Sequence, residues 1–285
     1  MLFARFFQNV LAELRNIALE ETDFRLEARY QELFRKYHRQ RKELRVTAPR
    51  VYFEYSNEDV LVSEFVFGIR LTEILDAIER SDTSYLETLA NLSIRPSTIA
   101  KRLIRSKYYS FHECPFFHGD PHPGNALVQP HNRIVMLDFG ACGVFSERDR
   151  RLMLRMNELY VRADVSDMVD CVLGLLEPLP LADVDCFKKG LLDEWWKGYY
   201  GLQSDHAEWW ERTSLRLWMA LLKLFGKYQI SMPANMIRMV RATLLYETVA
   251  AKLYPKINVF TEFAVYHAGR ERHRGYGRVE STNGL

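Results

Sequence analysis

Two short loops of the sequence contain the residue types that phosphoryl transfer requires. The first, residues 117–125, reads Phe-His-Gly-Asp-Pro-His-Pro-Gly-Asn, and the second begins at Asp138, which is followed by Phe and Gly. Transfer of phosphate from ATP needs Mg²⁺ to neutralise developing charge, amide and carboxylate oxygens to hold the metal, and a separate Asp to orient the attacking hydroxyl. We therefore predict that His118 and Asp120 are catalytic. Asn125 and Asp138 are the predicted magnesium ligands.

The spacing of these residues is more informative than their types. Protein kinases use a His-x-Asp sequence, an Asn five residues after that Asp, and an Asp-Phe-Gly sequence at the end of a following strand. These requirements are met in order by His118, Asp120, Asn125 and Asp138. Each residue alone has a structural explanation as a turn or core residue, but the combination arises by chance in about one in ten thousand chains of this length. His122, in the same loop, is expected to be structural.

A β-hairpin is expected to hold the two loops together. Val128 and Ile134 lie in short apolar runs on either side of residues 129–133, which include Pro and Asn. The hairpin would place Asn125 just before its first strand and Asp138 just after its second. Strand ends on a rigid scaffold can fix two metal ligands close together.

The residues before this hairpin predict a helix and a further hairpin. Apolar residues spaced three and four apart predict a helix with one buried face, and Glu21 falls on that face. A buried carboxylate needs a cation or a metal as partner, and the alternative is a register break on an exposed helix. Residues 50–54 and 60–67 predict two strands joined by a turn at 56–59. The helical face consists of Val10, Leu14, Ile17, Phe24 and Ala28.

Most of the remaining chain has helical periodicity. Gly68 ends the strand pattern and residues 71–78 resume helical spacing, so a lobe boundary is expected near Gly68. Residues 85–109 predict a helical region that is interrupted near Pro96. Residues 148–266 have helical spacing throughout.

Five tryptophans lie in this last helical region, and most are expected in the core. Two neighbours on a helix point about 100° apart, so one member of each adjacent pair, at 195–196 and at 209–210, is expected at the surface. Exposed aromatic residues beside basic ones can dock on membranes, although a large helical lobe also explains these residues.

Composition restricts the classes of partner. The chain has 285 residues, 48% of them hydrophobic and 27% charged, as in ordinary soluble proteins. A net charge of +2 lacks the basic excess of nucleic-acid-binding proteins, so no nucleic-acid partner is expected. No run of about 18 apolar residues predicts a transmembrane helix, and no secretory signal is evident. An intracellular protein is expected, cytoplasmic, organellar or peripheral to a membrane.

A local excess of Lys and Arg occupies residues 35–50. It has two interpretations: a solvated helix end, or a patch for anionic lipid or another acidic partner. The four cysteines show no spacing typical of zinc ligands.

The two loops resemble those of the UbiB/ABC1/AarF family of atypical kinases. The family's catalytic loop commonly reads His-Ala-Asp-Pro-His-Pro-Gly-Asn, and residues 118–125 read His-Gly-Asp-Pro-His-Pro-Gly-Asn. Residues 137–140, with Gly143 and Arg148, are similar to its metal-binding segment. Residues 20–28 resemble its Glu-x-Asp motif. The resemblance extends over residues 8–265, although the C-terminal matches, which include Pro233 and Arg241, are weak taken singly.

The resemblance implies a fold, cofactors and further site residues. The implied fold is α+β and protein-kinase-like, with a reduced N-lobe (a small antiparallel sheet plus a helix) and a large helical C-lobe. ATP and Mg²⁺ are the implied cofactors. The implied nucleotide-site residues are the acidic Glu21, Asp23 and Glu27 and the adenine-linker residues Glu64, Phe65 and Val66.

The front of the nucleotide-binding lobe departs from the family pattern. Members carry a Lys-x-Gly-Gln motif, an Ala-rich loop over the phosphates and a strand Lys that pairs with an acidic helix residue. None of these precedes Glu21, so no strand Lys is assigned. The chain is expected to be a fragment, a truncated gene product or a degenerate member, with incomplete coordination of ATP.

We therefore divide the chain into a partial N-lobe at residues 1–67, a C-lobe at 68–268 and a flexible tail at 269–285. The expected function is Mg-ATP binding with ATPase or phosphotransferase activity, and the resemblance implies support of ubiquinone or other isoprenoid-lipid metabolism. Nucleotide and an isoprenoid lipid or anionic membrane surface are the expected partners, and the oligomeric state stays open. The alternatives are a catalytically impaired pseudokinase scaffold and a small-molecule phosphotransferase of the aminoglycoside or choline kinase type.

Overall fold

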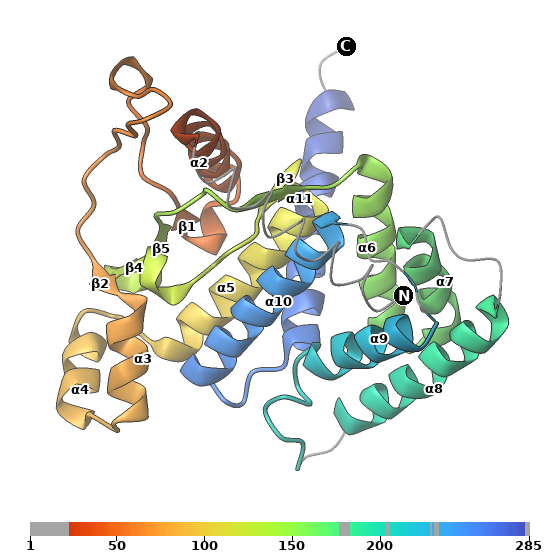
Figure 1. Cartoon of the computed structure of the whole chain (residues 1–285). Coiled ribbons are helices and arrows are strands. Elements are labelled where there is room, and N and C mark those ends of the chain that lie inside the picture. The colour runs from red at the N-terminus through yellow and green to blue at the C-terminus, as the bar shows by residue number, and fades with distance from the viewer. Residues whose placement is uncertain (1–22, 177–182, 203–205, 229, 231–233, 283–285) are drawn as a thin grey trace.

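A computed structural model of the chain describes residues 23–176, 183–202, 206–228, 230 and 234–282 (Figure 1). It is an α+β fold in which two small sheets lie beside a large set of helices. Glu21 and the helix predicted before residue 23 lie outside the described residues, as does Pro233, one of the C-terminal matches.

The helix α2 (Phe24–Arg39) lies above the larger sheet in the view of Figure 1. It begins after Asp23, whose carboxylate accepts a hydrogen bond from the backbone N–H of Arg25, the capping interaction typical of Asp. Its buried face includes Ala28, Phe34 and His38. A short 3₁₀ turn, η1 (Lys42–Leu44), then leads into the first strand.

Four short strands form the larger sheet, in the order β1-β5-β4-β2. The predicted hairpin at its centre is confirmed, because β4 and β5 pair antiparallel with Val128 opposite Ile134. The strand β1 pairs parallel with β5, and β2 pairs antiparallel with β4. The strands are β1 (Val46–Thr47), β2 (Ile69–Arg70), β4 (Ala126–Gln129) and β5 (Arg133–Met136).

The second sheet joins the two predicted loops. The strands β3 (Phe116–His118) and β6 (Cys142–Val144) pair antiparallel, with His118 opposite Cys142. The end of the first loop's strand is therefore fixed against the segment that follows Asp138.

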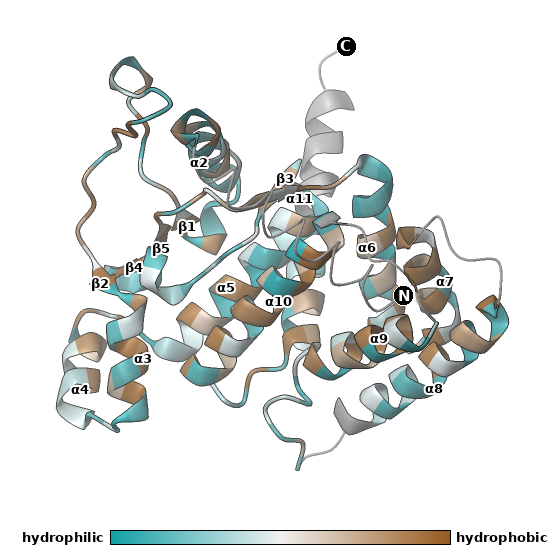
Figure 2. Cartoon of the chain, viewed as in Figure 1, coloured by the Kyte–Doolittle hydropathy of each residue, from teal (hydrophilic) through white to brown (hydrophobic). Residues whose placement is uncertain are grey.

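The arm at residues 50–67 differs from the regular hairpin predicted there. Its two sides run antiparallel, but they share one isolated bridge, Val51 with Ser63, and a 3₁₀ turn, η2 (Phe53–Tyr55), replaces the end of the first strand. The Ser56 hydroxyl accepts from the Val62 N–H, so a side chain takes the place of a strand partner. Figure 1 shows the arm projecting away from the helices, and Figure 2 shows hydrophobic stretches along it.

Helices make up the rest of the described chain, and α5 lies at their centre. It packs against α10, α11, α6 and β3. The predicted interruption near Pro96 is confirmed, since Pro96 is the first residue of α5, where its missing N–H is harmless. The helices are α3 (Leu71–Glu79), α4 (Thr83–Asn91), α5 (Pro96–His112), α6 (Glu147–Val161), α7 (Val165–Leu175), α8 (Val184–Leu202), α9 (Leu215–Tyr228), α10 (Ala234–Leu253) and α11 (Val259–Thr282).

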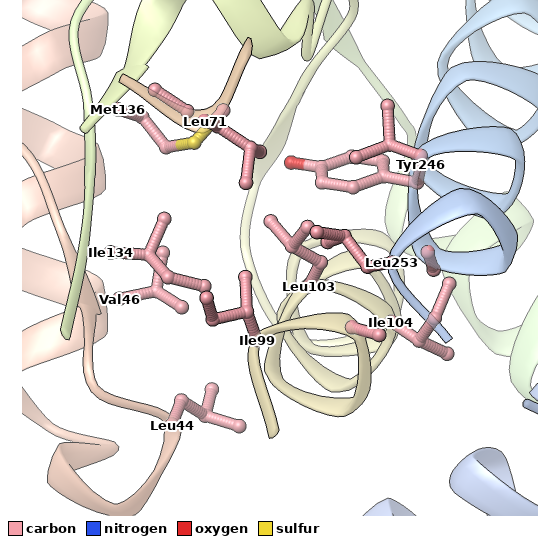
Figure 3. Packing of buried hydrophobic residues seen from close by; sticks show 14 of the residues in the cluster. Leu44, Val46, Leu71, Ile99, Leu103, Ile104, Ile134, Met136, Tyr246 and Leu253 are labelled. Carbon is pink, nitrogen blue, oxygen red and sulfur yellow. The ribbon is translucent and has the colours of Figure 1, made fainter. Parts of the chain in front are cut away.

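Two buried clusters form the core. The first joins α2 and the larger sheet to α3, α5, α10 and α11, and Figure 3 shows Val46 and Ile134 facing Ile99 and Leu103 of α5. The predicted lobe boundary near Gly68 thus lies between segments that share one core. The second cluster is built from α6, α7, α8, α9 and the start of α10.

The helix α11 continues past Gly269 to Thr282, within the segment predicted as a flexible tail. Arg270 is buried beside Glu113 and Glu158, with nitrogen to oxygen distances of 4.0 Å to each. The flexibility of the segment stays a prediction.

The tryptophan pairs behave differently from each other. Trp195 is buried and Trp196 is exposed, as predicted, whereas Trp209 and Trp210 are both exposed because they lie in a turn before α9. Among the described residues, no helix has the length and apolar character needed to span a bilayer.

Candidate functional site

The two predicted magnesium ligands meet at one end of the β4–β5 hairpin. Asn125 ends the short 3₁₀ turn η3 (Pro123–Asn125) just before β4, and Asp138 follows β5. The backbone N–H of Leu137 donates to the Asn125 carbonyl at 2.9 Å. The Asn125 side-chain amide donates to Asp138 Oδ2 at 2.8 Å. The predicted proximity of these two side chains is therefore present in the structure.

The carboxylate of Asp138 is held from its own loop as well. Its Oδ1 accepts from the Gly140 N–H at 3.0 Å. Phe139 is fully buried, with its ring 5.0 Å from that of Phe34 and 5.1 Å from that of His118. A ring fixed on two sides allows Asp138 little freedom to turn away.

Glu27 connects the helix α2 to this segment. Its Oε1 accepts a hydrogen bond from the backbone N–H of Phe139 at 3.2 Å, across 112 residues of sequence. The predicted acidic residue thus reaches the Asp-Phe-Gly segment through the backbone.

His118 is buried and neutral. Burial lowers its pKa to about 4, an effect that the nearby Asp138 opposes only in part. Its Nδ1 accepts from the Asp120 N–H at 3.3 Å, which assigns the proton to Nε2. Nε2 has no hydrogen-bond partner among the described residues. This geometry suits a residue that positions the loop.

Gly119 stands where the loop of the UbiB/ABC1/AarF family commonly has Ala, and its close contact with the second loop explains this difference. Its N–H donates to the Ala141 carbonyl at 2.6 Å, and a Cβ at this position would lie 2.6 Å from the same oxygen. No real Cβ contact is that short, so the close approach of the two loops requires glycine here.

Asp120 has an ion-pair partner that sequence reasoning missed. Arg241 of α10 lies with its Nη2 2.6 Å from Asp120 Oδ2, and the two side chains are 41% and 27% exposed. One turn earlier on α10, Arg238 donates to the Cys142 carbonyl at 3.0 Å. The helix α10 therefore contacts both loops. The only signal in the sequence was the weak C-terminal resemblance at Arg241.

His122 has a structural role, as expected. It caps η3, and its Nδ1 accepts from the Gly124 N–H at 3.1 Å. The loop's turn is thereby closed by a side chain of the loop itself.

Several predicted site residues have partners elsewhere. The carboxylate of Asp23 caps α2 and pairs with Arg25. Glu64 lies on the arm, where its Oε2 accepts from the Arg50 N–H at 3.1 Å. Phe65 is 79% exposed and Val66 is partly buried. None of the six described strands contains a lysine.

Asn125 and Asp138 fit a magnesium ion that also binds phosphate. Mg²⁺ is commonly held by one or two protein oxygens, with waters and phosphate oxygens completing its shell. A rotation of the Asn125 amide would turn its oxygen toward Asp138 Oδ2, so both oxygens could face one ion. No cluster of three His, Cys, Asp or Glu suited to a metal occurs in the described part of the chain. The donor set therefore suits a shared Mg-phosphate site better than an all-protein cage.

Comparison with known proteins places this arrangement in context. The chain is 27% identical to ACTIVITY OF BC1 COMPLEX KINASE 7, a chloroplastic protein of Arabidopsis thaliana, over 64% of this chain and 24% of that protein. It is 30% identical to the probable protein kinase UbiB of Aliivibrio fischeri, over 50% of this chain and 25% of that protein. The chain thus spans about a quarter of the length of each of these curated relatives.

A solved structure shares the fold. The Rv3197–erythromycin complex of Mycobacterium tuberculosis superposes with a TM-score of 0.54 at 21% identity, over 86% of this chain and 58% of that one. The fold is accordingly protein-kinase-like, with a small N-terminal part and a large helical C-lobe. The sequence pattern of the ABC1 atypical kinase-like domain matches residues 1–172, which contain both loops. With 172 of its 285 residues matched, this chain belongs to the ABC1 atypical kinase-like family.

Proposed function

We propose that this chain binds Mg-ATP at the two loops and hydrolyses it or transfers its terminal phosphate. Asn125 and Asp138 would hold the ion. Asp120 would orient the attacking hydroxyl or water and accept its proton, as the corresponding Asp does in kinases. The bound Mg²⁺ would neutralise charge on the phosphate oxygens.

One observation carries this proposal: the Asn125–Asp138 contact at 2.8 Å, supported on three sides. Gly140, the buried Phe139 and Glu27 all restrain the Asp-Phe-Gly segment. Preorganised ligands of this kind bind a metal without reordering the loop.

We further propose that the activity supports ubiquinone or another isoprenoid-lipid pathway at a membrane surface. The support is the family and the printed name of the UbiB relative. Exposed aromatic side chains on and after α8, namely Trp196, Tyr200, Trp209 and Trp210, are of the type that inserts at lipid headgroups.

A second candidate is a scaffold that binds nucleotide without turnover. The observation that favours it is the Asp120–Arg241 ion pair, which occupies the carboxylate that would accept the proton. A substrate would have to displace Arg241 or share Asp120 with it.

Phosphate release from Mg-ATP, measured with and without anionic phospholipid vesicles, separates the two candidates. The enzyme proposal expects release that depends on Mg²⁺ and rises with vesicles. Saturable Mg-ATP binding without release in either condition would leave the scaffold. Absence of Mg-dependent nucleotide binding would contradict both.

A further inference from the structure

A cavity lies in the helical part, away from the two loops. We call it the helical cavity; it is lined by α5, α6, α7, α8, α9, α10 and the first turn of α11, and its empty volume is about 730 Å³ including the open solvent at its mouth. None of its lining residues belongs to residues 117–125 or 137–141, so it is separate from the proposed nucleotide site.

The walls of the helical cavity are mainly apolar and adaptable. Five of the chain's nine methionines line it. Methionine side chains are unbranched and polarizable, so they fit ligands of irregular shape. They are Met153, Met156, Met168, Met236 and Met239.

Four residues that line the helical cavity each carry a buried polar atom without a hydrogen-bond partner among the described residues. Seven buried side-chain nitrogen or oxygen atoms of the described residues lack a hydrogen bond, and four of them belong to residues that line the helical cavity. The four residues are each 7% exposed or less. Because buried polar groups are nearly always hydrogen-bonded, such a concentration indicates a missing partner. The atoms are His112 Nδ1, Tyr160 Oη, Trp195 Nε1 and Thr243 Oγ1.

Two of these groups can only donate. The indole Nε1 of Trp195 carries a hydrogen and no lone pair for acceptance. The Asn157 side-chain nitrogen lies 3.4 Å from His112 Nε2. If that amide donates to Nε2, then Nε2 is the accepting nitrogen of the neutral ring and Nδ1 carries the proton. Burial lowers the pKa of His112 well below its usual value, so the ring is neutral. The hydroxyls of Tyr160 and Thr243 can donate as well.

The charged residues beside the helical cavity are already paired. Lys107 Nζ lies 2.6 Å from Glu247 Oε1, and both side chains are buried. The other oxygen of Glu247 accepts from the backbone N–H and hydroxyl of Ser214 at 2.7 and 2.8 Å. A charged ligand would find no free counter-charge among the described lining residues and would lose its hydration.

We propose that the helical cavity binds a neutral, mostly apolar molecule that carries carbonyl oxygens. Carbonyl oxygens accept hydrogen bonds and carry no charge, which matches the donors of Trp195 and His112 and the hydroxyls of Tyr160 and Thr243. The apolar frame of the molecule would pack against the methionines. Each hydrogen bond formed there replaces one that the carbonyl makes with water, and it gives a partner to a buried group that has none among the described residues.

The test uses a ketone and the hydrocarbon of the same frame. α-Tetralone carries one carbonyl oxygen and tetralin carries none. Both are titrated into the full chain by isothermal titration calorimetry. We expect saturable one-to-one binding of both, with the ketone bound about 3- to 10-fold more tightly, as one or two added hydrogen bonds imply.

Three variants test the candidate donors, and a fourth variant serves as a matched control. Tyr160→Phe, Thr243→Val and Trp195→Phe each remove a polar atom and keep most of the side-chain volume. In at least one of them the affinity for α-tetralone is expected to fall to about that for tetralin, while the affinity for tetralin changes little. Ser110→Ala removes a buried unpartnered hydroxyl outside the helical cavity and is expected to change neither.

Two results would overturn the proposal. The first is no saturable binding of either compound, as expected of a space filled by ordered water. The second is equal binding of ketone and hydrocarbon in the parent chain and in all three variants, which would mean that the cavity selects only apolar volume.

Discussion

The two loops of the proposed nucleotide site (residues 118–125 and 137–141) and the helical cavity differ in how their polar groups are partnered. In the loops the carboxylates have partners within the chain: Asp120 pairs with Arg241, and Asp138 accepts from Asn125 and Gly140. In the helical cavity four neutral groups have none among the described residues.

The two regions also differ in exposure. Asp138 is exposed and Asp120 is partly exposed, so water can hydrate both carboxylates, whereas the four neutral groups of the helical cavity are buried. A ligand in the two loops would therefore exchange existing partners. A ligand in the helical cavity would supply partners to buried groups that have none among the described residues.

The largest effect is expected at Asp120. Asp120→Ala removes the group that orients the nucleophile, which acts mainly in the transition state, so turnover of Mg-ATP should fall by about 10²- to 10⁴-fold. Nucleotide affinity should stay within several-fold. Steady-state phosphate release and a separate binding titration measure the two quantities.

A matched change at the partner residue tests whether the ion pair or the carboxylate matters. Arg241→Gln keeps a polar side chain and frees Asp120. If Asp120→Ala instead abolishes binding and leaves residual turnover normal, the role assigned to Asp120 is wrong.

Asp138→Asn is expected to weaken Mg-dependent nucleotide binding by about 100-fold or more, since even outer-shell partners of a metal contribute 10- to 100-fold. The fold should change little, because Asp138 is on a loop at the edge of the core. The readout is the thermal shift produced by Mg-ATP. Asp193→Asn, an exposed Asp of α8, is the control and should keep the full shift. An undiminished shift in Asp138→Asn would mean that Asp138 is not a ligand.

Buried histidines extend the comparison to titratable groups, because burial disfavours the charged form of the ring. Burial lowers the pKa of His38 to about 3, although the Phe34 carbonyl opposes this. The unfolded chain takes up a proton near pH 6.5 and the folded chain does not, so His38 makes stability fall as the pH drops from about 6.5 toward 3, by up to about 1.4 kcal/mol per pH unit. Urea unfolding at pH 7 and pH 5 measures this.

His38→Phe keeps the ring that stacks on Phe34 at 3.7 Å and removes the titrating group. The variant should be less stable at pH 7, because Ser106 loses its partner, but its stability should decline less between pH 7 and pH 5. An unchanged decline would show that His38 is protonated in the folded chain.

The proximity of the two loops was predictable from sequence because local spacing fixes it. Asn125 and Asp138 are 13 residues apart and one hairpin joins them. Arg241 could not be found in this way, since it lies 121 residues from Asp120 and an isolated Arg on a helix carries no pattern. The four unpartnered atoms of the helical cavity come from four helices, and their lack of partners exists only in three dimensions.

One secondary-structure prediction was wrong for an identifiable reason. The arm has the β-branched and aromatic composition of strands, yet Ser56 satisfies backbone groups that a regular ladder would use. A side-chain contact there outweighed the average preference of the segment.

The smallest effect is expected at Asp23, which the family resemblance assigns to the nucleotide site. In the structure its carboxylate caps α2 and pairs with the exposed Arg25, which lowers the pKa of Asp23. Asp23→Ser keeps a capping oxygen and removes the charge. If capping is its role, Mg-ATP affinity should change by no more than about two- to threefold, because exposed ion pairs contribute little and are screened by salt. Asp23→Ala, which removes the cap as well, should lower the melting temperature more than Asp23→Ser. A loss of binding in Asp23→Ser as large as that in Asp138→Asn would place Asp23 among the groups that bind the nucleotide, and the proposed site would then extend from the two loops to the start of α2.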